Sequence, residues 1–79
     1  MYKFKIDLHT LDPDQRKEEK RRLEKELESI CSYIKIIPYN NVLTVNVSPI
    51  NPSDIAQFID DLSAIIQTYP DYSEIEHVN

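Results

Sequence analysis

The chain matches itself at an offset of 39 residues without gaps, and this self-similarity limits the folds that it can adopt. The matched positions are apolar in both copies: Phe4 with Leu43, Ile6 with Val45, Leu8 with Val47, Leu23 with Leu62, Leu27 with Ile66 and Ile36 with Ile75. Two copies are typical of an internally duplicated domain and too few for a solenoid. Either gene duplication or convergent patterning in a symmetric fold would produce this register, and both imply two halves built alike.

Each half contains a strand, a helix and a second strand. Apolar residues alternate with polar ones over 2–8 and 42–48, which is the period of a half-buried strand. Asp12-Pro13 and Asn51-Pro52 predict helix N-termini, and the apolar stripe of the second helix extends to Tyr69 before Pro70. We expect further strands at 34–39 and 72–78, and a tight turn at Asn40-Asn41. Pro38 marks the strand 34–39 as an edge strand.

The order of elements is therefore β-α-β-β-α-β, in a single α+β domain over residues 1–79 with halves at 1–39 and 40–79. Right-handed crossovers predict a four-stranded antiparallel sheet in the order 4-1-3-2, with both helices on one face. This pattern resembles the ferredoxin-like superfold over the whole chain. Since that superfold carries many unrelated activities, the resemblance implies a fold and no function.

The composition argues against several kinds of catalytic and cofactor site. The chain has no glycine, which P-loops, dinucleotide-binding turns and nucleophile elbows require. His9 and His77 have no paired metal ligand at short spacing, and Cys31 is the only cysteine. We therefore expect a non-enzymatic protein without a cofactor or a metal ion. The single cysteine, the absence of an apolar run of about 18 residues and the absence of a signal peptide favour a cytoplasmic location and no membrane partner.

The charges are segregated along the chain. The net charge is −5, no base follows Lys35, and six of the nine bases lie between Arg16 and Lys25. The acidic balance, together with strand aromatics on the inward face, disfavours nucleic acid as a ligand. The first turns of the first helix carry charges where the second helix carries Ile55, Phe58 and Ile59. These charged side chains either lie along the rim of the core or face a partner, with helical pairs expected at Glu18–Arg22 and Arg21–Glu24.

The alternation of the strands also predicts the open face of the sheet. Lys3 and Lys5 would lie there opposite Glu74 and Glu76 of the last strand, which explains the two lysines without a ligand. Ile37 and Tyr39 of the edge strand would share this face.

The function that we expect is binding to a protein partner or to a second copy in a homodimer, through an edge strand or the charged helix. The residues assigned to it are Arg16, Lys17, Lys20, Arg21, Ile37 and Tyr39. The small size and acidity suggest an accessory or inhibitor protein of a phage or mobile element. The alternative is an ACT-like regulatory domain. Its small-molecule site would lie where both helices begin, which we expect to be one end of the sheet, at His9, Thr10, Ser48 and Asn51.

Overall fold

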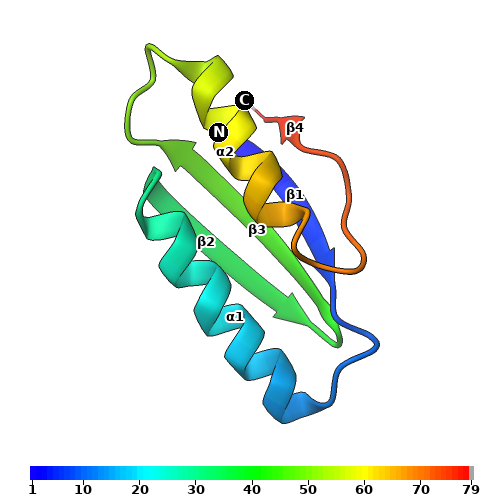
Figure 1. Cartoon of the computed structure of the whole chain (residues 1–79). Helices are drawn as coiled ribbons and strands as arrows, with labels where there is room; N and C mark the ends of the chain where they lie inside the picture. The colour runs from blue at the N-terminus through cyan, green and yellow to red at the C-terminus, as the bar shows by residue number, and fades with distance from the viewer. Residues whose placement is uncertain (79) are drawn as a thin grey trace.

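The computed structural model describes residues 1–78 and forms two layers, a four-stranded antiparallel sheet and two helices that cover one of its faces (Figure 1). The elements are β1 (Tyr2–Asp7), α1 (Pro13–Glu28), β2 (Cys31–Tyr39), β3 (Val42–Pro49), α2 (Ile55–Ile66) and β4 (Glu76–His77). The strand order is β2-β3-β1-β4, or β4-β1-β3-β2 from the other edge. The predicted α+β class, the antiparallel sheet and the two helices are confirmed.

One core fills the space between the sheet and the helices. The inward residues of β1 and β3 are almost completely buried, as their alternation predicts, and α1 and α2 cover them with Leu23, Leu27, Phe58, Leu62 and Ile66. Tyr69, beyond the end of α2, and Cys31, at the start of β2, are buried as well. The core thus joins both halves, and neither half has one of its own.

Helix α1 begins as predicted. The Asp12 carboxylate accepts a hydrogen bond from the backbone N–H of Gln15 at 2.9 Å, and the Gln15 side chain accepts one from the N–H of Asp12 at 3.2 Å. Pro13 occupies the first helical position, where its missing N–H costs nothing. The reciprocal pair is a capping box, and it sets the start of the helix at Pro13.

The predicted start of the second helix is wrong by three residues. Asp54, not Asn51, is the N-cap of α2, and its carboxylate accepts from the N–H of Gln57 at 3.3 Å. Asn51 instead accepts hydrogen bonds from the N–H and hydroxyl of Ser53, at 3.2 and 2.6 Å. This local turn occupies the segment in which the first half already has a helix. The two halves therefore depart from their common register here.

The strand β2 is longer than predicted, since it begins at Cys31 and not at residue 34. A two-residue turn at Asn40-Asn41 joins it to β3, with Asn40 at a φ of 54° in the left-handed region that Asn tolerates. In such a hairpin the closing pair, Tyr39 with Val42, is hydrogen-bonded, and so is every second pair beyond it. Pro38 falls between two of these pairs. Its missing N–H is therefore on the free side of the strand, where Pro is tolerated.

The predicted strand 72–78 is only partly present. Tyr72 bridges to Ile6, and β4 pairs Glu76 with Lys3 and His77 with Tyr2. These two pairings differ in register by one residue, so the strand contains an extra residue between them. The Ser73 hydroxyl accepts the bond from the N–H of Lys5 at 2.8 Å where a regular ladder would supply a backbone carbonyl.

The extra residue changes one of the predicted cross-strand pairs. Glu76 lies opposite Lys3 as expected, but Lys5 lies beside Ser73 and not opposite Glu74. Insertion of one residue shifts the side chains that follow it relative to the neighbouring strand. The explanation of Lys5 by a carboxylate partner is therefore wrong.

Candidate protein-binding site

Large apolar and aromatic side chains stand on the open face of β2, the strand at one edge of the sheet. Tyr33, Ile37 and Tyr39 are 43%, 45% and 75% exposed. They follow one another at even spacing, so they share the face that neither helix covers. The position of Ile37 and Tyr39 confirms the predicted face. Tyr33 was missed because the strand was expected to begin after it.

The neighbouring strand extends this stripe at one end and limits it elsewhere. Tyr39 lies opposite Val42, and Ile37 lies opposite Thr44. The next strand, β1, places Asp7 and Lys5 beside these two residues of β3. The open face is thus mainly apolar along β2, where Lys35 is the one charged residue, and charged along β1, so an apolar contact would concentrate at the β2 edge.

The outer edge of β2 is free of backbone pairing in the part of the chain that the structure describes, because β3 is its only neighbour in the sheet. The alternation set by the hairpin directs the N–H groups of Ile34 and Ile36 to this edge, up to the shift in register between Cys31 and Tyr33. An unpaired row of donors and acceptors is a template for one more strand. Pro38 removes one donor near the end of the row without closing the rest of it.

Bases of α1 lie beside the same edge. Arg22 and Glu19 face α2, since the Arg22 guanidinium lies 4.8 Å from the centre of the Tyr69 ring and the Tyr69 hydroxyl donates to the Glu19 carbonyl at 3.4 Å. The spacing of the helix then puts Lys17 and Lys20 on the opposite flank, which overhangs β2. Three of the predicted binding residues, Arg16, Lys17 and Lys20, are brought together here.

These bases line a hollow of about 360 Å³ between the first turns of α1 and the β2–β3 turn. Among residues 1–78, its remaining walls are apolar or neutral: Leu8, Pro13, Pro38, Asn40 and Leu43. Arg16 is held by a hydrogen bond from its Nε to the carbonyl of Leu8 at 3.3 Å. Arg16 and Lys20 are half-buried on the core rim, as the first reading of the charged turns expects, and they also border a concave surface.

Arg21 lies elsewhere on the helix. It lines a different hollow, with Arg22, Lys25 and three glutamates, on the solvent side of α1. The ion pairs predicted at Glu18–Arg22 and Arg21–Glu24 are wrong. Arg22 pairs instead with Glu19 at 2.6 Å, and Lys20 pairs with Glu24 at 3.6 Å. The ring of Tyr69 attracts Arg22 to the α2 side, which helical spacing within α1 alone did not indicate.

The small-molecule site predicted at the helix starts is not assembled. His9 and Thr10 follow β1 at the end that carries the β2–β3 turn, since Leu8 N–H donates to the Asn41 carbonyl at 2.7 Å. Ser48 and Asn51 lie at the opposite end, where Tyr2 pairs with Val47. The prediction failed because β1 and β3 are antiparallel, so helices that follow them begin at opposite ends of the sheet. The four residues form no common pocket.

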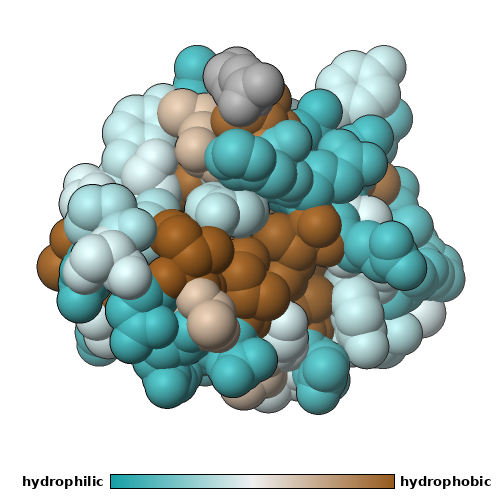
Figure 2. All heavy atoms as spheres, turned by 90° about the horizontal axis from the view of Figure 1, so that it is seen from above, coloured by the Kyte–Doolittle hydropathy of each residue, from teal (hydrophilic) through white to brown (hydrophobic). Residues whose placement is uncertain are grey.

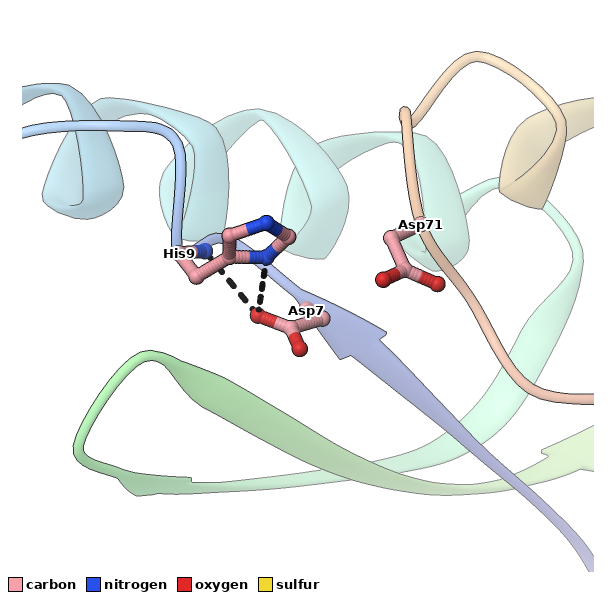
Figure 3. A group of neighbouring side chains, drawn as sticks. All are labelled: Asp7, His9 and Asp71. Carbon is pink, nitrogen blue, oxygen red and sulfur yellow. Dashed lines mark hydrogen bonds and ion pairs between the residues drawn. The ribbon is translucent and has the colours of Figure 1, made fainter.

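Three potential metal ligands meet at the end of β1. Asp7, His9 and Asp71 each offer an atom within 4.8 Å of the others (Figure 3). One oxygen of Asp7, Oδ1, already accepts bonds from Asn41 Nδ2 at 2.7 Å and from the N–H of His9 at 2.9 Å, and it lies 3.0 Å from His9 Nδ1. The hydrogen bond from Asn41 is the largest influence that lowers the pKa of Asp7. These contacts fasten the end of β1 to the β2–β3 turn.

Two buried side chains, Cys31 and Tyr69, have raised pKa values. Burial raises the pKa of the Cys31 thiol to about 11, so the thiol is protonated at neutral pH and packs as a small core residue. Burial also raises the pKa of Tyr69, although the neighbouring Arg22 opposes this change. Both groups are therefore parts of the packing.

The end of the molecule at which α2 begins carries apolar and acidic side chains instead of bases. Figure 2 shows apolar side chains gathered in a band across the end at which α2 begins. A hollow of about 220 Å³ at the start of α2 is lined by Ile30, Ile50 and Phe58 together with Asp54 and Asp61. No base borders it among residues 1–78. The two ends thus carry concave surfaces of opposite charge.

Comparisons with protein-family models, with curated proteins and with solved structures find no match to this chain. Within residues 1–78, neither helix has the length and apolar character needed to cross a membrane.

Proposed function

We propose that this protein is a non-enzymatic interaction module that binds an extended segment of another protein chain along β2. The observation that carries the proposal is the exposed stripe of Tyr33, Ile37 and Tyr39 on a strand whose outer edge is unpaired. Strand addition of this kind draws affinity from the backbone bonds and specificity from alternate side chains. Aromatic residues at the centre of such a contact contribute most of its binding energy.

We also propose that the fold is ferredoxin-like. The element order, the antiparallel pairing of β1 with both β3 and β4, and the two helices on one face support this assignment. In this topology β2 and β4 are the edge strands. The β4 edge is short and irregular, whereas β2 offers nine residues, so β2 is the better site for strand addition.

The test uses peptides selected from a random library against the whole protein. We expect the selected peptides to shift the backbone amide signals of β2 in an NMR titration. Ile37→Lys should weaken their binding about thirtyfold, since a buried interface anchor contributes about 2 kcal/mol. The matched control is Ile50→Lys, because Ile50 is equally apolar and 58% exposed but lies at the other end of the molecule.

Peptides that bind both variants equally, or that shift the amides at the start of α2 instead, would contradict the proposal, and so would a library without binders. Analytical ultracentrifugation of the free protein tests whether the partner is a second copy of the same chain. A dimer that Ile37→Lys dissociates and Ile50→Lys leaves intact would identify that copy as the occupant of β2. A dimer that survives Ile37→Lys would place self-association on another surface.

A further inference from the structure

We infer that the segment bound along β2 alternates acidic and apolar residues, with its acidic side chains on the helix side near Pro38. The inference rests on the function proposed above and adds the chemistry of the partner. Successive side chains of an added strand point to opposite faces of the sheet. Every second side chain of the partner therefore contacts the open face of the sheet, and the side chains between them contact the helix face.

The open face selects apolar side chains. Ile37 and Tyr39 stand there beside the free edge, and Val42 continues the apolar surface behind Tyr39. Lys35 is the only charged residue of β2 and lies between Tyr33 and Ile37 on the same face. A partner side chain on this face contacts mainly apolar and aromatic groups, so burial of a branched or aromatic side chain is favoured.

The helix face selects acidic side chains. Lys17 and Lys20 lie on the flank of α1 that faces away from α2, and with Arg16 they border the hollow of about 360 Å³ that Pro38 also lines. In the described part of the chain, this lining holds three bases and no acid. They produce a positive potential in a concave, partly apolar site, where charge interactions are stronger than in open water. A carboxylate that enters from the added strand would meet these bases.

The bases remain available to a partner. Among residues 1–78, the one ion pair made by the three is that of Lys20 with Glu24, at 3.6 Å, and the two side chains are only partly exposed, at 38% and 44%. Arg16 uses its Nε for the Leu8 carbonyl and retains its terminal nitrogens. Glu24 and Glu28 occupy the same flank farther along α1, so the preference for acids is confined to the half of the edge near Pro38.

A second copy is a poorer occupant than a different chain. If β2 of another copy added to this edge, its helix-side residues would be Ile34, Ile36 and Pro38. None of them carries a negative charge, so the bases of both copies would face one another without compensation. Charge complementarity therefore favours an acidic segment of another protein.

The experiment compares three fluorescently labelled, capped hexapeptides: alternating Glu-Val, alternating Lys-Val, and three Glu followed by three Val. We expect alternating Glu-Val to bind at least tenfold more tightly than either of the others, by fluorescence anisotropy at physiological salt. The block peptide has the same composition and charge, so it isolates the alternation. Amide shifts in β2 locate the bound peptide.

The variants test the bases. Lys17→Gln with Lys20→Gln should weaken binding of the Glu-Val peptide about fivefold to tenfold. The matched control is Arg21→Gln with Lys25→Gln, which removes the same charge from the solvent side of the same helix and should leave the affinity unchanged. All four positions are on the helix surface, and circular dichroism verifies that both double variants are folded.

Three outcomes would overturn the inference. If Glu-Val and Lys-Val peptides bind equally and both shift β2, the partner chemistry is wrong while the proposed strand addition stands. If the control double variant loses as much affinity as Lys17→Gln with Lys20→Gln, net charge and not the hollow attracts the peptide. If no extended peptide shifts β2, the proposed function itself fails.

Discussion

Helices α1 and α2 hold equivalent places in the two halves, yet they contribute differently to the core. Over their first turns α2 has Ile55, Phe58 and Ile59, and Phe58 is buried at 4% exposure. At the matching positions α1 has Arg16, Glu19 and Lys20, which are half-buried. Apolar side chains of α2 cover their side of the sheet, whereas the first turns of α1 border a basic hollow near the free edge of β2. Helix α1 therefore packs less apolar surface against the sheet than α2 does, and its first turns border a charged concave surface instead.

The largest expected difference in stability is between substitutions at Phe58 and at Glu19, which occupy matching positions in the two helices. Phe58→Ala should lower the free energy of unfolding by about 3–5 kcal/mol, because it leaves a cavity between α2 and Tyr2. Glu19→Ala should cost about 1 kcal/mol through its ion pair with Arg22. Urea denaturation followed by far-ultraviolet circular dichroism measures both, and similar losses would show that the two helices pack alike.

The next largest difference in stability is expected between the N-terminal caps of α1 and α2. Asp12→Ala should destabilise by about 1–2 kcal/mol and Asp54→Ala by about 1 kcal/mol, since Asp12 belongs to a reciprocal capping box and Asp54 accepts one longer bond. Asn51→Ala should cost less than Asp54→Ala, because Asn51 lies in the turn before α2. Thermal denaturation ranks the three variants. A larger loss for Asn51→Ala than for Asp54→Ala would restore the start predicted from the repeat.

Of the two adjacent arginines of α1, Arg22 contacts Tyr69 beyond the end of α2, and Arg21 lies on the solvent side. Arg22→Gln should lower stability by about 1 kcal/mol, because Arg22 pairs with Glu19 and lies over the Tyr69 ring. Arg21→Gln is the control and should stay within about 0.5 kcal/mol of the parent protein, as a substitution on the solvent side. Equal effects in urea denaturation would mean that the Tyr69 contact contributes nothing measurable.

The smallest effect concerns pH and the end of β1. The pKa of Asp7 is lowered below its ordinary value of 3.8, so its ionised form stabilises the folded state above that pH. This stabilisation is lost as the pH falls through the lowered pKa. Asn41→Ala removes the strongest bond to the carboxylate, so the Asp7 pKa measured by NMR should rise toward 3.8 and acid unfolding should begin at a higher pH. Asn51→Ala, at the other end, should leave that pKa unchanged.

Local patterns predicted much of the fold. The helix start at Asp12-Pro13 and the alternation of Phe4, Ile6 and Leu8 are short-range signals, and each has its expected place. The second helix was expected to reach Tyr69 but ends at Ile66, although Tyr69 is buried as its apolar stripe indicated. The start of α2 was misjudged because the repeat suggested a second Asx-Pro cap, while a serine two residues later forms a competing turn with Asn51. The extra residue before Glu76 has no local signature, because it becomes visible only when the strand is paired.

The candidate site was predicted in parts. Helical spacing and charge identified Arg16, Lys17 and Lys20, and strand alternation identified Ile37 and Tyr39. Their proximity depends on which flank of α1 faces α2, and the contact of Arg22 with Tyr69, 47 positions apart, decides that. The expected clustering of His9 with Asn51 was wrong for a related reason, since the direction of β3 relative to β1 places them at opposite ends of the sheet.

The sequence by itself determined the periods, the caps and the alternation of charge with apolar residues, because these depend on neighbours within a few positions along the chain. The tertiary structure decided which of those residues share a surface. Strand direction, register and the flank that a helix turns toward its neighbour arise from contacts between distant segments, and the free energy of those contacts is not encoded in any local window. That is why the bases of α1 and the edge of β2 became one site only in the folded molecule.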